Sequence, residues 1–161
     1  MRHRRLTLAL VAACLAPSAG AQSASFATQE RDLAAIDIAS TNLVVSRLGT
    51  LCLALVGRPE TPQAFVADWQ QRNVRYVSAS AKYLDQRVAQ AATEGRREQA
   101  LGEIRAVVEN NAEAALRQLL RDRKEDGCMN AITLSDTGAL DISPKLPQYD
   151  QLEALARWAA Q

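Results

Sequence analysis

The sequence predicts an all-α protein, an antiparallel bundle of three long helices that is followed by a short C-terminal helix and held by one disulfide. Three observations lead to this prediction. Apolar residues recur at helical spacing over three long stretches. The 161 residues are rich in alanine and only 4% are aromatic, which favours closely packed helices over a β-sandwich. Two cysteines also fall where such a bundle would bring them to the same end.

The first helix is expected to run from near Thr28 to Leu55. Its inward face is formed by residues at helical spacing, all apolar except Ser40: Leu33, Ile36, Ser40, Leu43, Val44, Leu48, Leu51 and Leu55. Gly57 follows, and glycine can adopt the left-handed conformation that closes a helix. Pro59 cannot continue the helix, so the first element must end here.

The second helix is expected to begin almost at once. Thr61 suits the N-cap position and Pro62 the first helical position, which predicts a helix from Pro62 to about Thr93. Gly95 is expected to end it. The apolar stripe of this helix consists of Phe65, Val66, Trp69, Tyr76, Val77, Leu84 and Val88.

The third helix is expected to run from about Arg96 to Lys124, with cations in its last turn where the helix dipole favours them. Gly127 is the residue predicted to close it. The side chains expected to face inward are Leu101, Ile104, Val107, Val108, Ala115, Leu116, Leu119 and Leu120.

The stretch 129–148 shows no helical period. Apolar residues alternate on either side of the turn-like tetrapeptide 135–138, which predicts a short β-hairpin or an extended flap near 131–143. Asp150 and Glu153 have the spacing of a capping box and indicate the start of the last helix. Its apolar residues are Leu152, Leu155 and Trp158.

The two cysteines Cys52 and Cys128 are predicted to form a disulfide. Long helices joined by short connections are antiparallel neighbours, so the ends of the first and third helices lie at the same pole. Cys52 lies in the last turns of the first helix, and Cys128 follows the third. The alternative, two buried free thiols, does not suit an even pair in an exported chain.

The N-terminus predicts export. Three arginines precede the apolar run 6–16, and Ala19-Gly20-Ala21 offers a cleavage site. We therefore expect a secretory signal peptide over 1–21 and a single helical-bundle domain over 22–161, located in the periplasm or secreted. As an alternative, the residues before Cys14 resemble a lipobox, and lipidation of Cys14 would produce an outer-membrane lipoprotein. A spanning anchor is disfavoured because the apolar run is too short.

The net charge of the mature chain argues against nucleic acid and anionic membranes as partners. The signal peptide carries three of the 19 Lys and Arg residues, so the mature chain has 16 of them against 18 Asp and Glu, a net charge of −2. A nearly neutral chain with interspersed charges gives no reason to expect nucleic acid or an anionic membrane as partner. We expect no membrane insertion of the mature chain unless Cys14 is lipidated.

The residue inventory argues against most enzyme chemistry. His3 is the only histidine and leaves with the signal peptide, which excludes histidine-based catalysis and imidazole metal sites from the mature chain. Paired cysteines supply no thiolate, and no glycine-rich phosphate loop is present. We therefore predict a non-enzymatic protein with no cofactor and no metal. A hydrolase that uses two carboxylates is the remaining enzymatic alternative.

The candidate binding residues lie mainly on the second helix: Trp69, Arg72, Asn73, Arg75 and Tyr76, together with Asn111 on the third helix. Asn73 and Asn111 fall on apolar faces, where they could bond each other or Tyr76 and fix the helix register. Trp, Tyr and Arg are also the residues enriched at interface hot spots. The same residues therefore allow a structural and a partner-binding interpretation.

Two functional hypotheses follow besides the carboxylate enzyme. The first is an exported protein that acts by binding a protein partner, for example in an immunity, inhibitor or adaptor role. The second is a small-ligand carrier with a polar pocket between helices, lined by Asn73, Tyr76 and Asn111.

Overall fold

The computed structural model describes residues 19–121 and 124–161, and side chains from residue 28 onward. The described chain folds into helices and contains no strand. The predicted Cys14 lipid site and most of the predicted signal peptide lie outside the described residues, although the first helix includes residues 19–21. The helices are α1 (Ala19–Cys52), α2 (Pro62–Arg72), α3 (Val74–Thr93), α4 (Arg97–Leu119), α5 (Lys124–Asp136) and α6 (Tyr149–Ala159).

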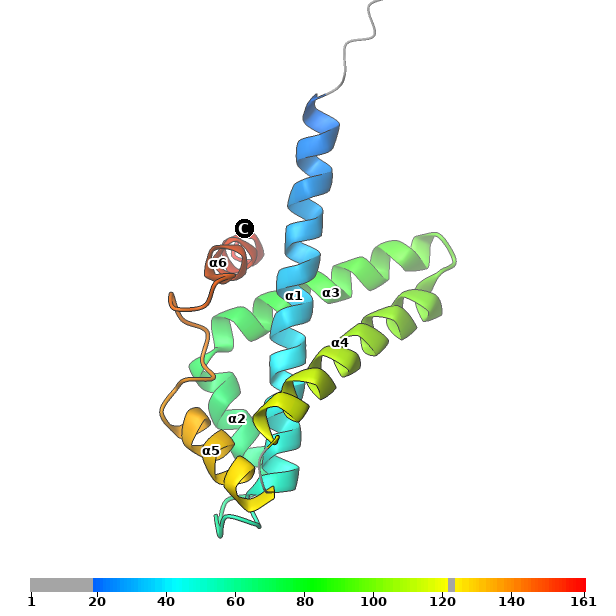
Figure 1. Ribbon diagram of the computed structural model, residues 1–161. Coiled ribbons are helices and arrows are strands. Elements are labelled where there is room, and N and C mark those ends of the chain that lie inside the picture. Colours follow the sequence, from blue (N-terminus) through cyan, green and yellow to red (C-terminus); the bar gives the residue numbers. More distant parts are fainter. Residues whose placement is uncertain (1–18, 122–123) are drawn as a thin grey trace, which may run out of the picture.

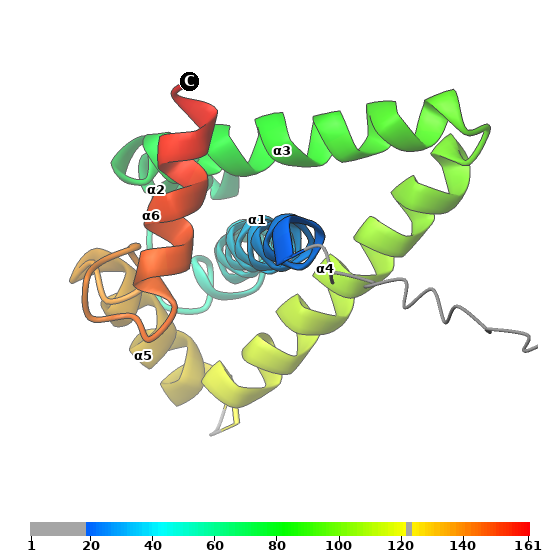
Figure 2. The same cartoon turned by 90° about the horizontal axis from the view of Figure 1, so that it is seen from above.

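Helix α1 is the centre of the fold. It contacts each of the helices α2 to α6. Figure 2 looks along α1 and shows α3, α4, α5 and α6 placed around it. Helices α3 and α4 form a hairpin whose arms slant across α1 in Figure 1, so the predicted bundle of three antiparallel rods is not the observed arrangement.

The predicted second helix is divided at Asn73, which corrects the expectation of one helix over 62–93. Asn73 occupies the C-cap position of α2 and the N-cap position of α3, with φ −109° and ψ 18°. Its side chain bonds the distant connection at 141–142 rather than the start of α3. Because the backbone leaves helical geometry here, α3 takes a new direction and crosses α1. Helix α2 remains near the end of α1 (Figure 1).

The second predicted end is confirmed, since α3 ends at Thr93, whereas α1 spans Ala19–Cys52 and so begins before Thr28 and ends before Leu55. The two glycines adopt the expected conformation. Gly57 and Gly95 have φ of 70° and 71°. The N–H of the residue after each glycine donates to a carbonyl five residues back, over 2.9 Å in both cases, which satisfies the end of the helix. Thr61 caps α2, where its hydroxyl accepts from the N–H of Ala64 at 3.2 Å.

The region after the third helix differs from the prediction. Helix α4 ends at Leu119, and Gly127 does not close it but lies inside α5. A Cβ at Gly127 would stand 3.1 Å from Cα of Leu120, a tight contact, so a larger residue here would require the Leu120 backbone to shift slightly. The predicted hairpin near 131–143 is also wrong, because 131–136 belong to α5 and the rest contains no strand.

The core has two parts. One surrounds the disulfide, where α1, α2, α4 and α5 meet, and the other lies between the first half of α1, α3 and α6. The predicted Cys52–Cys128 disulfide is confirmed; both residues are fully buried, and their Cα atoms are 5.1 Å apart. It joins the end of α1 to the start of α5 at the lower pole of Figure 1. Among the helices of the described chain, none combines the length and the apolar character needed to cross a membrane.

Candidate functional site

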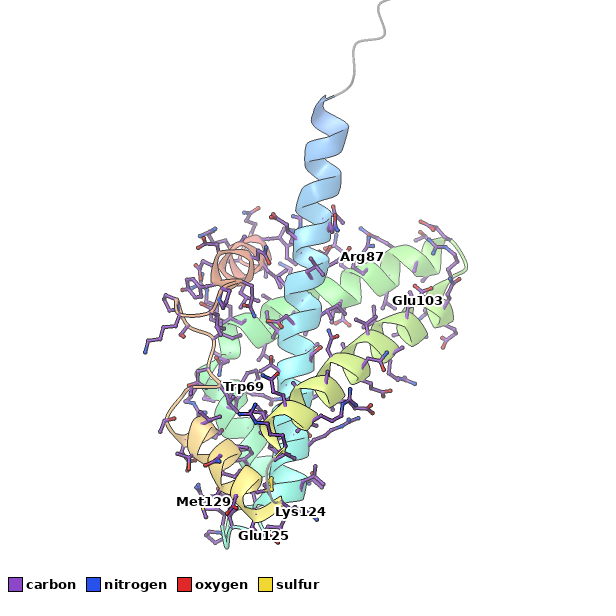
Figure 3. The ribbon with its side chains drawn as sticks, in the orientation of Figure 1. Trp69, Arg87, Glu103, Lys124, Glu125 and Met129 are labelled. Carbon is purple, nitrogen blue, oxygen red and sulfur yellow. A yellow bond between two sulfur atoms is a disulfide. The ribbon has the colours of Figure 1, made fainter. Side chains whose placement is uncertain are left out.

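The candidate residues of the α2–α3 region contact the rest of the chain. Trp69 is fully buried, and its Nε1–H donates to the carbonyl of Leu140 at 3.0 Å. Figure 3 labels Trp69 within the body, on α2. This ring therefore offers no surface to a partner and anchors the connection between α5 and α6.

Asn73 is only 2% exposed and forms three side-chain hydrogen bonds. Its Nδ2–H₂ donates to the carbonyl of Trp69 at 2.9 Å and to Oδ1 of Asp141 at 3.1 Å. Its Oδ1 accepts from the N–H of Ile142 at 2.8 Å. A buried amide with its donors and acceptor satisfied is a structural element.

Arg72 binds the connection between α5 and α6 from the protein surface. Its guanidinium donates to both oxygens of Asp141, at 2.9 Å and 3.2 Å, and to the carbonyl of Ser135 at 3.2 Å. It also pairs with Asp68 one turn earlier. The hydrogen bond with Asp141 raises the pKa of Arg72. Paired donors of this kind fix geometry well.

Arg75 and Tyr76 hold helix α6. Both donate to the carboxylate of Glu153, with 3.1 Å between the Tyr76 hydroxyl and Oε2. The Tyr76 hydroxyl also bonds that of Tyr149 at 3.3 Å. The bond from Arg75 lowers the pKa of Glu153, and burial raises the pKa of Tyr76.

These five residues form the α2–α3 clamp: Trp69, Arg72, Asn73, Arg75 and Tyr76. Their polar groups bind the 137–148 connection and α6. Sequence reasoning missed the acceptors Asp141 and Glu153, which lie 69 and 78 residues from their arginine partners. Asn111 is not part of the clamp, since it is exposed on α4 and none of the described hydrogen bonds joins it to Asn73.

A first cleft opens between α1, α3 and α4, with a volume of about 420 Å³. Figure 3 shows Arg87 of α3 and Glu103 of α4 on the two arms of the hairpin beside it. The Arg87 side chain pairs with Asp32 of α1 at 3.1 Å. The apolar side chains of this cleft are Ile36, Leu84, Ala91, Ala100, Ile104 and Val107.

A second cleft of about 500 Å³ lies between α1, α4 and α6. It shares Asp32, Ile36 and Val107 with the first, so the two clefts form one groove along α1 and α4, named here the α1–α4 groove. The second cleft is also lined by Leu33, Ala34, Asp37, Asn111, Gln148 and Gln151.

The groove contains apolar residues that the sequence predicted to face inward. Leu33 is 59% exposed and Val107 is 46% exposed. The predicted inward face of the first helix is only partly right, since Val44 and Leu48 are buried but Leu51 and Leu55 are exposed besides Leu33. Figure 1 shows α4 diverging from α1 toward the tip of the hairpin. The apolar faces of the two helices are therefore left partly uncovered at this end.

The groove is suited to binding apolar side chains within a polar rim. No group of three or more His, Cys, Asp or Glu side chains in the described chain is placed to hold a metal ion. Comparisons with known protein families, with curated proteins and with solved structures find no match to this chain. The functional argument therefore depends on the geometry of the groove.

Proposed function

We propose that this protein is an exported, non-enzymatic binding protein that accepts an amphipathic helix of a protein partner in the α1–α4 groove. The observation that carries the proposal is the partly uncovered apolar stripe of α4, in which Val107 is exposed and Leu101, Ile104 and Val108 are half-buried. Between residues 97 and 111 no side chain is buried, although Leu101, Ile104, Val107 and Val108 recur at helical spacing. One turn later the same stripe is covered, with Ala112 at 0% and Leu116 at 8% exposure.

A helix laid between α1 and α4 would complete the packing that these two helices begin. Uncovered apolar surface rimmed by polar groups is typical of interaction sites, and helix-in-groove recognition uses anchors three and four residues apart. Leu33 and Ile36 line one side of the groove, and Ile104 and Val107 line the other. A partner helix would bury these four side chains together.

The charges around the groove favour a cationic helix. Its lining holds four carboxylates, of Asp32, Asp37, Glu94 and Glu103, against the two guanidinium groups of Arg87 and Arg96. Both arginines already pair with Asp32 and Glu94.

The other two carboxylates have neutral hydrogen-bond donors. Asp37 accepts from Gln148 at 3.0 Å, and Glu103 accepts from Gln99 at 2.9 Å. Lys or Arg side chains flanking the apolar face of a partner helix would complement them.

Export is supported by the N-terminal pattern and by the disulfide, because disulfides persist in oxidising compartments. The binding role is supported by the groove. The absence of histidine from residues 4–161 argues only against histidine-based catalysis. In this proposal the clamp keeps α6 and the 137–148 connection in place, so that Gln148 and Gln151 line the groove.

The experiment places a photo-crosslinking amino acid at Val107 in cells that make the full chain. Met129 of α5 is the matched control, since it is 51% exposed against 46% for Val107 (Figure 3). The crosslinked peptide is identified by mass spectrometry, synthesised and titrated against the purified chain by fluorescence anisotropy. Val107→Glu should weaken its binding at least about tenfold, a loss of about 1.4 kcal/mol, whereas Met129→Glu should leave it unchanged.

The proposal is supported only if the peptide crosslinks at 107, forms an amphipathic helix with Lys or Arg beside its apolar face, and loses affinity with Val107→Glu. Crosslinking equal at 107 and 129, or an affinity that Val107→Glu does not change, would overturn it. Because Val107 is exposed, the variant should keep the melting temperature of the parent chain within a few degrees.

A further inference from the structure

The groove between α3 and α6 is a separate feature from the site above. It has a volume of about 510 Å³ and is lined by Arg75, Ser78, Ala79, Lys82, Ala156, Arg157, Ala159 and Ala160. The α3 residues are three and four positions apart, so they form one face of that helix. The small side chains on both helices keep the groove open, and the cationic side chains of Arg75, Lys82 and Arg157 line it.

Positive charge is in excess at this groove. Arg75 and Arg157 share one carboxylate, that of Glu153, which Arg75 contacts directly and Arg157 approaches only to 3.9 Å. Lys82 has no ion pair with a described residue: its Nζ donates to the carbonyl of Ala159 at 2.6 Å and lies 5.5 Å from the ring centroid of Trp158. Three cations against one carboxylate give a local charge of +2.

The groove also has unused hydrogen-bond donors. An ammonium group has three N–H bonds, and Lys82 directs one of them to Ala159. The Arg157 side chain is 64% exposed. The exposed hydroxyl of Ser78 has no hydrogen bond with another described residue. These donors come from both helices and face the same space.

We propose that the α3–α6 groove binds a phosphate group. A phosphate monoester or inorganic phosphate carries about −1.5 to −2 charges at pH 7, which matches the local charge, and offers three or more acceptor oxygens. Lys82, Arg157 and Ser78 supply the donors, while Arg75 stays with Glu153. A carboxylate, with a single charge, matches the groove less well. The phosphate can come from a soluble molecule or from a lipid headgroup that is itself a phosphate monoester, as in phosphatidic acid.

The test titrates inorganic phosphate into the purified ¹⁵N-labelled chain at constant ionic strength. Amide shifts should move around Ser78, Lys82 and Arg157, with saturation, and sodium acetate should produce smaller changes. Lys82→Gln combined with Arg157→Gln should weaken binding at least about tenfold, because it removes two charged donors. Lys145→Gln combined with Arg105→Gln is the matched control, since it removes the same charge from two exposed positions elsewhere.

A second arm measures co-sedimentation with vesicles that contain phosphatidic acid, a phosphate monoester, against vesicles of phosphatidylcholine alone. Saturable phosphate binding without vesicle binding identifies a soluble phosphate ligand, whereas vesicle binding lost in the Lys82/Arg157 variant identifies a headgroup. The proposal is overturned if neither probe binds, or if the control pair weakens binding as much as the Lys82/Arg157 pair. Val107→Glu should leave this binding unchanged, so failure here is distinct from failure of the proposed partner site.

Discussion

At the scale of single residues, Asn73 has the most structural consequences. It is a fully bonded amide at the point where α2 gives way to α3. Its backbone departs from helical geometry, with φ −109° and ψ 18°, and its side chain bonds Asp141 and Ile142 of a distant segment. The direction change from α2 to α3 and the attachment of the 137–148 connection therefore coincide at this residue.

Replacing Asn73 with alanine should destabilise the protein by about 1–3 kcal/mol. The substitution leaves the N–H of Ile142 without its acceptor, and an unsatisfied group of this kind costs about 1–3 kcal/mol. Asp141 loses one donor to Oδ1 but keeps the two bonds from Arg72. Urea unfolding followed by circular dichroism measures the loss. Asn111→Ala is the matched control, since Asn111 is exposed and should change stability by less than about 0.5 kcal/mol. Equal losses for the two variants would refute this role of Asn73.

The sequence could place Asn73 on the buried side of its helix but could not supply its partners. Its position four residues after Trp69 follows from helical spacing. Asp141 and Ile142 lie 68 and 69 residues further along, in an irregular segment without a pattern that points to α2. Five of the six candidate residues thus came from the right region, but their contacts with the rest of the chain could not be read from local spacing.

At the scale of the elements, α5 shows why a helix can be missed. Its buried residues Gly127, Cys128, Ala131, Ile132 and Ser135 have helical spacing. Four of the five are small or weakly apolar, so the stripe carries little hydrophobic signal, and the alternation of larger residues from 132 to 142 suggested strands instead. Small residues are needed here because α5 packs closely against the disulfide and the end of α4.

Gly138 illustrates the same ambiguity. The tetrapeptide 135–138 was interpreted as the turn of a hairpin, and a chain reversal is present there. Gly138 has φ 70°, and the N–H of Ala139 donates to the carbonyl of Leu134 at 2.8 Å. This is the geometry that closes a helix, so the glycine ends α5. The residue type predicted the positive φ but not the structure that precedes it.

Attachment of α6 should depend on pH through Glu153. The bonds from Arg75 and Tyr76 favour the ionised carboxylate, and the pKa of Glu153 is lowered from its usual 4.5. Stabilisation by this group is therefore complete above about pH 4.5 and is lost as pH falls through the lower pKa of the folded state. Hydrogen-exchange protection factors of α6 should decrease over that range while those of the α1 core change less.

The variant Glu153→Gln tests whether this carboxylate causes the loss of α6 protection in acid. It keeps an acceptor for Tyr76 but removes the charge, so α6 should be less protected than in the parent chain at pH 7 and should show little further loss between pH 5 and 3. A variant that still loses protection in acid as the parent does would show that another group controls the docking of α6.

At the scale of the whole molecule, the sequence predicted that the chain is helical and disulfide-linked, but it did not predict how the helices are arranged in space. Helical class, the left-handed conformation of Gly57 and Gly95 and the Cys52–Cys128 disulfide follow from residue type and spacing. The crossing of α3 and α4 over α1 depends on the break at Asn73 and on the contacts of the 137–148 connection, which are long-range. The α1–α4 groove exists because of this crossing, so it could not be foreseen from a stripe of apolar residues.

The disulfide should stabilise the molecule as a whole. It joins residues 76 positions apart, and the closed loop contains α2, α3 and α4. In the chain-entropy account, a loop of this length restricts the unfolded chain enough to contribute about 4 kcal/mol. Cys52 and Cys128 are also fully buried in the cluster where four helices meet, so the bond constrains elements that must already be in contact.

Replacing both cysteines with alanine should therefore lower the free energy of unfolding by about 3–5 kcal/mol without changing the helical content of the folded state. Urea unfolding of the parent chain with dithiothreitol should give a similar loss, whereas the double variant should not respond to the reductant. The slope of free energy against urea should rise in the double variant, because the unfolded chain without its cross-link exposes more surface. If reduction leaves the urea midpoint of the parent chain unchanged, contacts around α1 alone hold the two ends of the loop together, and the stabilising role of the disulfide is refuted.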